Sequence, residues 1–98
     1  MSLAVAYLPE AQDDIDAAYA QYEQRLMGLG DRFLEALRQV VERFADNPDL
    51  YGVVHQDVRA APLRRFPYVV YYRSEPGRVL IIAVQHGRRS SRAWQGRA

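Results

Sequence analysis

The chain lacks cysteine and lysine altogether. Without cysteine it forms no disulfide and has no thiolate to serve as a nucleophile or a metal ligand, so a reducing, intracellular compartment is compatible with the sequence. All 13 basic residues are therefore arginine. Such a bias arises either from genomic composition or from a preference for the bidentate contacts that a guanidinium makes with phosphates and carboxylates.

Several familiar signals are also missing from the sequence. No apolar run approaches the roughly 18 residues of a membrane span, and the N-terminal MSLAVAYLPEAQ has no basic region before a long apolar run. We therefore expect a soluble, cytoplasmic protein without membrane contact. The chain also has no glycine-rich phosphate loop, no Ser-His-Asp pattern and no metal-ligand spacing between His55 and His86, so we expect no metal and no cofactor.

The charges are distributed very unevenly along the chain. With 98 residues, 49% hydrophobic and 26% charged, the composition predicts a single globular domain over residues 1–98. Residues 1–50 hold four arginines and ten acidic residues, a formal charge of −6, whereas residues 51–98 hold nine arginines and two acidic residues, a formal charge of +7. An arginine-rich half is typical of proteins that bind an anion, either nucleic acid or an acidic protein.

The N-terminal half predicts a short strand and two helices. Leu3–Tyr7 is a short apolar run that favours a strand, and residues 9–27 carry apolar side chains at helical spacing after a proline and an acidic first turn. A second amphipathic helix runs from Asp31 to Phe44 and stops at Asn47-Pro48. Because only Gly28-Leu29-Gly30 separates them, the two helices form an antiparallel hairpin.

The C-terminal half predicts a meander of three strands. Val53–Arg59, Tyr68–Arg73 and Val79–His86 are rich in β-branched and aromatic residues, and a Pro-Gly turn at Ser74–Gly77 joins the last two. Leu63–Phe66, between two prolines, predicts an edge strand or a bulge. The order β-α-α-β-β-β predicts an α+β fold, in which the helical hairpin packs on a small, mainly antiparallel sheet and a short C-terminal helix or turn follows.

The last strand is apolar on both sides, so both faces of the sheet need cover. The two helices precede the meander and cover one face. The opposite face is left to the C-terminal segment, which Trp94 would anchor, or to another molecule.

Strict alternation along this strand predicts where a site would lie. In an unbroken strand Leu80, Ile82 and Val84 share one face, and His86 and Arg88 continue the same parity. Two polar groups would then stand at one end of an apolar face, which makes that end the first place to look for function.

Metal-free RNA cleavage is the catalytic chemistry that the residues allow. It needs cations that hold the phosphate and a group that transfers protons. Histidine is the side chain most often suited to proton transfer, which makes His86 the candidate, and Tyr68, Tyr71 or Tyr72 could stack bases. The candidate cations are Arg59, Arg64, Arg65, Arg73, Arg88 and Arg89.

Each of these residues also has a purely structural interpretation. A histidine at a strand end commonly hydrogen-bonds to backbone, and the tyrosines suit core and cross-strand packing. Trp94 suits an anchor for a C-terminal helix or turn. Arg88 and Arg89 follow a buried strand and have no packing duty, although a solvated basic tail would also account for them.

Several blocks of the sequence resemble one known family. They are Ala11 and Ile15, Tyr19–Glu23, residues 28–34 (GLGDRFL), Asn47-Pro48, Val58-Arg59, Leu63–Tyr72 (LRRFPYVVYY), Val79–His86 and Arg88–Trp94. The whole chain resembles the RelE/ParE superfamily of type II toxin-antitoxin toxins, in its ParE-like, plasmid-stabilisation branch. The resemblance implies the α+β fold given above and a cognate antitoxin, whose acidic or amphipathic C-terminal segment wraps and neutralises the toxin. The expected antitoxin contacts are Leu80, Ile82, Val84, Arg64 and Arg65.

The resemblance leaves two targets. RelE-like members cut mRNA on the ribosome with a cluster of basic residues, and in this chain the matching set is Arg59, Arg73, His86 and Arg88. ParE-like members act on DNA gyrase and are not nucleases. Because the lysines of RelE-like sites are absent and no tyrosine follows Tyr72, we expect a ParE-like toxin that inhibits gyrase by protein contact through Arg88, Arg89 and Trp94. The alternatives are an mRNA endonuclease and a non-toxic member that serves only as the antitoxin's partner.

Overall fold

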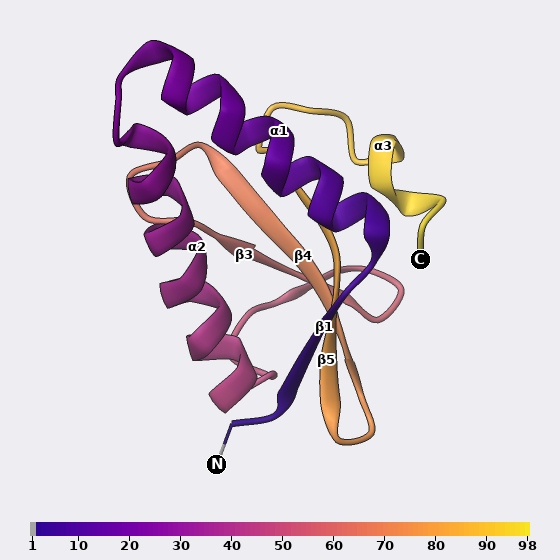
Figure 1. Cartoon of the computed structure of the whole chain (residues 1–98). Coiled ribbons are helices and arrows are strands. Elements are labelled where there is room, and N and C mark those ends of the chain that lie inside the picture. The colour runs from indigo at the N-terminus through magenta and orange to yellow at the C-terminus, as the bar shows by residue number, and fades with distance from the viewer. Residues whose placement is uncertain (1) are drawn as a thin grey trace.

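The computed structural model describes residues 2–98, which form one five-stranded sheet, two long helices and one short helix (Figure 1). Its class and element order confirm the predicted α+β fold, including the short C-terminal helix. Along the chain the elements are β1 (Ala4–Tyr7), α1 (Pro9–Arg25), α2 (Leu29–Asp46), β2 (Val53–His55), β3 (Val58–Pro62), β4 (Tyr68–Glu75), β5 (Arg78–His86) and α3 (Arg92–Gln95).

The sheet is mixed, with the strand order β1-β5-β4-β3-β2. β1 runs parallel to β5, and the other neighbours are antiparallel. The strand predicted over Val53–Arg59 is divided, because a turn with Gln56 at a φ of 51° folds it back into the β2–β3 hairpin. Leu63–Phe66 is a loop rather than a strand, and Arg65 within it has a φ of 67°, which no strand accommodates.

The hairpin of α1 and α2 depends on two glycines and one glutamate. Gly28 has a φ of 88°, in the left-handed region that favours glycine. The Glu23 carboxylate accepts hydrogen bonds from the backbone N–H groups of Gly28 and Gly30, each at 2.9 Å, and so satisfies donors at the start of α2. A Cβ atom on Gly30 would lie 2.7 Å from the Tyr19 ring, so the two helices approach each other at this residue.

Gly30→Ala tests this close approach. The added methyl group would overlap the Tyr19 ring and Glu23 Cγ, so we expect a loss of about 1–3 kcal/mol in the free energy of unfolding, measured by urea denaturation. Gly52→Ala is the matched control, because a Cβ there meets nothing within 4 Å and should change stability little. Equal stabilities for both variants would contradict the proposed contact.

One face of the sheet packs against the helices and carries the larger core. α2 contributes a stripe of apolar side chains at helical spacing, among them Phe33, Leu37 and Phe44. The Tyr72 ring stacks on Phe44 with centroids 3.8 Å apart, and its hydroxyl donates a hydrogen bond of 2.7 Å to the Pro48 carbonyl. This contact fixes the chain where it leaves α2.

β5 does not alternate strictly, because it contains a bulge. Tyr71 pairs with Ala83 but the next residue, Tyr72, pairs with Ile81, so Ile82 is an extra residue against β4. After the bulge Val84 joins the core on the helix side, whereas Ile82 packs on the opposite face.

The prediction that Leu80, Ile82 and Val84 share one face is therefore wrong. One inserted residue reverses the parity of everything that follows it. All three side chains are buried, with exposed fractions of 7%, 0% and 1%.

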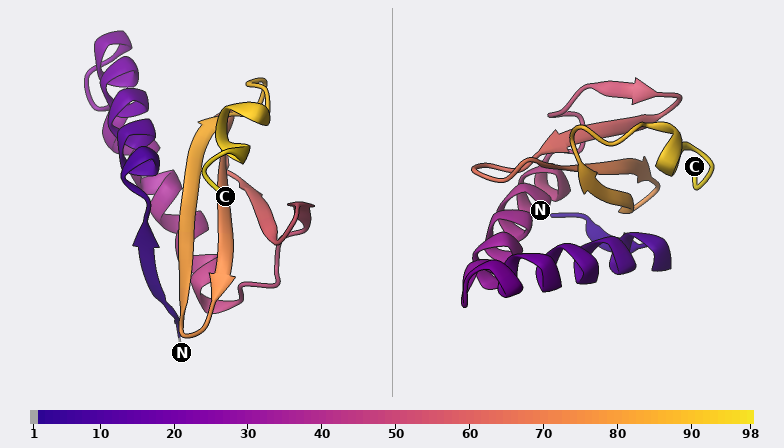
Figure 2. Two further views of the ribbon diagram at one scale, coloured as in Figure 1. Left: turned by 90° about the vertical axis from the view of Figure 1, so that its right-hand side faces the viewer. Right: turned by 90° about the horizontal axis from the view of Figure 1, so that it is seen from above.

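The opposite face of the sheet is covered by the C-terminal segment. Figure 2 (left) shows α1 and α2 on one side of the sheet and α3 on the other. Trp94 on α3 is 1% exposed, packs with Val58 and Ile82, and stacks on the Tyr71 ring with centroids 4.3 Å apart. The anchoring role predicted for Trp94 is therefore confirmed.

An ion pair ties the C-terminal segment to α1 beside the bulge. Arg97 Nη1 lies 2.7 Å from Asp14 Oδ2, and the two side chains are only 17% and 12% exposed. β1 pairs with β5 only as far as Ile81; beyond it, the Val84 N–H donates to Asp14 at 3.0 Å and Arg97 donates to the Ile82 carbonyl at 3.2 Å. The ion pair thus satisfies the edge of β5 where β1 no longer does.

Arg97→Ala tests this attachment. The change removes the donor to the Ile82 carbonyl and the cation beside the Asp14 carboxylate, which keeps only the Val84 N–H, so we expect a loss of about 1–3 kcal/mol in the free energy of unfolding. Trp94 is the sole tryptophan, so its emission should shift to longer wavelength as α3 loosens. Arg92→Ala is the control, because Arg92 is exposed on the same helix. Unchanged emission in Arg97→Ala would show that Trp94 alone holds α3.

Candidate functional site

The structure does not bring together the four residues predicted for a nuclease. Arg59 pairs across the sheet with Tyr72, so its side chain lies on the face that α2 covers. Its guanidinium donates to the Tyr51 carbonyl at 2.7 Å and lies 3.3 Å from the Asp49 carboxylate. Arg59 thus holds the chain that follows α2.

Arg73 lies on the other face of the sheet. Its cross-strand partner is Val58, which packs in the cluster under Trp94. The guanidinium of Arg73 is 3.4 Å from the Glu75 carboxylate, and hydrogen bonding to Arg78, with a further contribution from Arg73, lowers the pKa of Glu75. Both predicted phosphate-binding arginines of β3 and β4 therefore have carboxylate partners.

His86 stands at the opposite end of β5. His86 lies six positions along β5 from Leu80, the cross-strand partner of Arg73, and six positions of extended strand span about 20 Å. His86 Nδ1 accepts a hydrogen bond of 3.1 Å from the Arg88 N–H, and the imidazole ring contacts the Tyr68 ring edge-on at 5.7 Å. His86 therefore hydrogen-bonds to backbone, which is the structural interpretation that the sequence offered for a histidine at a strand end.

The predicted effector surface of Arg88, Arg89 and Trp94 is only partly exposed. The two arginines are in the β5–α3 loop, Gly87–Ser91, and are exposed. Trp94 belongs to α3, and its side chain is buried against the sheet. Tyr68, Tyr71 and Tyr72 have aromatic neighbours within the fold and serve packing.

Two loops meet at the end of the sheet where β5 finishes. The Gly87 N–H donates a hydrogen bond of 2.7 Å to the Pro67 carbonyl, which places the β5–α3 loop beside the β3–β4 loop, Leu63–Pro67. Tyr68 pairs with His86 at the same end. Four exposed arginines lie on these two loops and a fifth, Arg92, begins α3; we call these five residues together the basic end: Arg64, Arg65, Arg88, Arg89 and Arg92.

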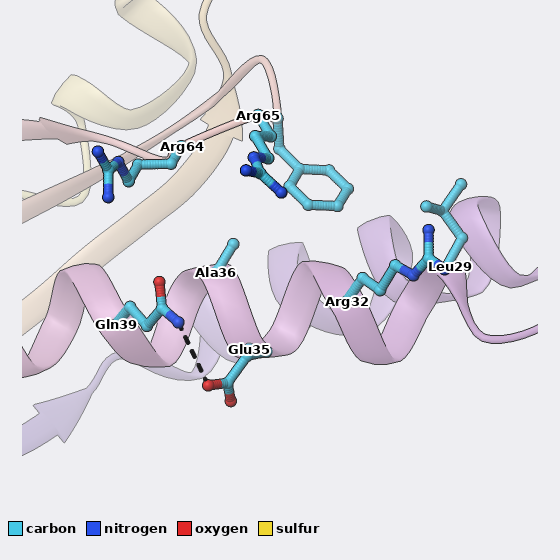
Figure 3. Close-up of a pocket in the computed structure, with 8 residues that line it drawn as sticks. Leu29, Arg32, Glu35, Ala36, Gln39, Arg64 and Arg65 are labelled. Atoms are coloured by element: carbon cyan, nitrogen blue, oxygen red, sulfur yellow. Dashed lines mark hydrogen bonds between the residues drawn. The ribbon is translucent and has the colours of Figure 1, made fainter.

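A groove opens between α2 and the β3–β4 loop (Figure 3). Its volume is about 910 Å³. Apolar lining comes from Leu29, Ala36 and Phe66, and positive charge from Arg32, Arg64 and Arg65. Glu35 also borders the groove, but its carboxylate is engaged by Arg38, whose hydrogen bond lowers the pKa of Glu35.

The β3–β4 loop is anchored above α2 by backbone and aromatic contacts. The Leu63 N–H donates to the Tyr68 carbonyl at 2.9 Å, which closes the loop. The Phe66 ring packs edge-on against Tyr22 and Phe33, with centroids 5.1 Å and 5.7 Å apart. Arg65 adopts a left-handed φ between these anchors, a conformation that costs about 1–3 kcal/mol and persists only where neighbours enforce it.

Sequence reasoning identified Arg64 and Arg65 but missed the α2 wall of the groove. The signal was available, because Arg32, Ala36 and Gln39 recur at helical spacing on the side of α2 that borders the core stripe. Their role depends on the loop that lies opposite, and only the tertiary structure supplies that neighbour.

The model of a protein family, described as the ParE toxin of the type II toxin-antitoxin system parDE, matches residues 5–91. The chain belongs to the ParE toxin family. The match runs from β1 to the end of the β5–α3 loop, and so includes the groove and four of the five arginines of the basic end. No curated protein sequence matches the chain.

A solved structure shares the fold of this ParE-family chain. It is described as the chromosomal ParDE toxin-antitoxin system from P. aeruginosa, and it superposes with a TM-score of 0.64 at 19% sequence identity. The match covers 87% of this chain and 96% of that chain. Within residues 2–98, no helix combines the length and the apolar character needed to cross a membrane.

Proposed function

We propose that the chain is the toxin of a ParDE-type pair, that it inhibits DNA gyrase by protein contact, and that a cognate antitoxin neutralises it. The observation that carries the proposal is the match of the ParE toxin family to residues 5–91. The similar fold of the ParDE system from P. aeruginosa supports the existence of an antitoxin partner.

The arrangement of the predicted nuclease residues favours gyrase over mRNA as the target. General acid-base cleavage requires its groups within hydrogen-bonding reach of one substrate. Here Arg59 and Arg73 are on opposite faces, each beside a carboxylate, and His86 is at the far end of the sheet. The remaining exposed candidates, Arg88 and Arg89, suit a contact surface for the target.

We propose the groove as the antitoxin site. Leu80, Ile82 and Val84 are buried and cannot receive a partner without displacing packed elements. The groove instead offers apolar lining on both walls together with Arg64 and Arg65, which matches an acidic, amphipathic segment whose apolar side chains enter the groove while its carboxylates meet the guanidinium groups.

Charge reversal tests the groove. In the double variant Arg64→Glu with Arg65→Glu, like charges would face the acidic antitoxin segment, so we expect the affinity for the antitoxin to fall about tenfold or more, measured by calorimetry. Arg43→Glu with Arg78→Glu changes the net charge equally from exposed positions outside the groove and should retain binding. Equal loss in both double variants would indicate a general charge effect and no groove site.

The target itself is tested by inducing this chain alone in bacteria and labelling DNA and protein synthesis within minutes. We expect DNA synthesis to stop while protein synthesis continues, and we expect the purified chain to inhibit supercoiling by gyrase. His86→Ala should remain toxic, because His86 bonds only to backbone of its own loop. An immediate collapse of protein synthesis that His86→Ala abolishes would support the mRNA endonuclease instead, and no effect on either process would indicate a non-toxic member.

A further inference from the structure

The arginines differ in whether the fold provides them with a carboxylate. Arg38, Arg59, Arg73, Arg78 and Arg97 each form an ion pair. Within residues 2–98, the arginines of the basic end form none, and all five are exposed. The same holds for Arg25, Arg32 and Arg43 on α1 and α2, but in the described part of the chain the basic end alone combines five such arginines on two adjoining loops and the start of α3, which favours an anionic partner.

The basic end consists of two surfaces that differ in chemistry. Beside Arg64 and Arg65 the groove is lined by the apolar side chains of Leu29, Ala36 and Phe66. The segment Gly87–Arg92, with the sequence GRRSSR, contains no apolar side chain and no acid, and each of its residues is exposed. We call this segment the arginine strip.

The two surfaces suit different classes of anion. Protein segments gain most of their affinity from apolar or aromatic anchors that enter pockets, and the arginine strip has nothing of that kind to receive them. A nucleic-acid backbone is held by arginines, serine hydroxyls and backbone N–H groups without apolar contact. The strip supplies two arginines, two serines and a third arginine in succession.

The arginine strip is also held in place at both ends. At its start, His86 accepts hydrogen bonds from the N–H groups of Arg88 and Arg89, at 3.1 Å through Nδ1 and at 2.9 Å through the carbonyl. At its end, the Arg92 N–H donates to Ser90 Oγ at 3.3 Å, and Trp94 anchors α3 on the sheet. A loop that is ordered in advance loses less conformational entropy on binding.

We propose that the arginine strip binds the phosphate backbone of duplex DNA, independently of base sequence. Arg88, Arg89 and Arg92 would contact phosphate oxygens, with Ser90 and Ser91 as further donors. The choice of DNA rests on the proposed function, because a toxin seated on gyrase acts where duplex DNA is held.

The proposal is tested by fluorescence anisotropy with labelled duplex DNA of arbitrary sequence and the full-length chain, without gyrase, over a series of salt concentrations. The strip variant carries Arg88→Gln, Arg89→Gln and Arg92→Gln. The matched control carries Arg38→Gln, Arg43→Gln and Arg78→Gln, which removes the same charge from exposed arginines elsewhere. Thermal unfolding verifies that both variants fold.

We expect the wild-type chain to bind DNA in a salt-dependent manner. The slope of log affinity against log salt should be smaller in the strip variant by about 0.9 for each arginine removed, and unchanged in the control. Equal weakening by both variants, or no binding by the wild-type chain at low salt, would overturn the proposal. It would also be overturned if the strip variant kept its affinity for DNA and lost its affinity for the antitoxin, since the strip would then be a protein contact.

Because gyrase is absent from this assay, the result is separable from the proposed function. Failure of the wild-type chain to inhibit supercoiling would reject gyrase as the target and leave the measured binding to DNA intact. Inhibition of supercoiling without any binding to DNA alone would retain the proposed function and reject the arginine strip as a DNA site.

Discussion

β5 imposes the main constraint on this fold, because it is apolar along most of its length and lies between β1 and β4 with both faces buried. α1 and α2 cover one face, and Trp94 covers part of the other. β1 is too short to satisfy the whole edge, so Asp14 and Arg97 complete it beyond Ile81. Residues 83 positions apart are thereby joined at the bulge, and the position of α3 follows from the need to cover β5.

The sequence allowed prediction of whatever depends on local pattern. The helical hairpin, the Pro-Gly turn between β4 and β5 and the anchoring of Trp94 follow from spacing, turn chemistry and the position of a large aromatic residue beyond a two-sided strand. The bulge at Ile82 has no local signature, because it depends on the pairing of Tyr71 and Tyr72 across the sheet. The prediction that Leu80, Ile82 and Val84 share one face failed for that reason, because Val84 lies on the face opposite Ile82.

In the candidate site, too, some residues could be identified from the sequence and others only from the fold. Arg64 and Arg65 were identified from charge, whereas Arg32 and Ala36 became visible only when the β3–β4 loop was placed above α2. The predicted nuclease set failed to converge for a topological reason. Neighbouring positions on paired strands alternate between faces, so Arg59 and Arg73 are separated by the sheet although they are close in the ladder.

The adjacency of the groove and the arginine strip connects the two proposals. The hydrogen bond from Gly87 to the Pro67 carbonyl keeps the two loops in contact, so an acidic segment in the groove would lie near the loop that carries Arg88. Such a segment would lower the positive potential of the strip without touching it. If both surfaces have the proposed occupants, the antitoxin opposes DNA binding by lowering the positive potential as well as by occupying volume. Neutralisation of the toxin would then require no movement of α3. The antitoxin's acidity would then matter beyond its fit to the groove, because each carboxylate near the basic end weakens the attraction of the strip for phosphate.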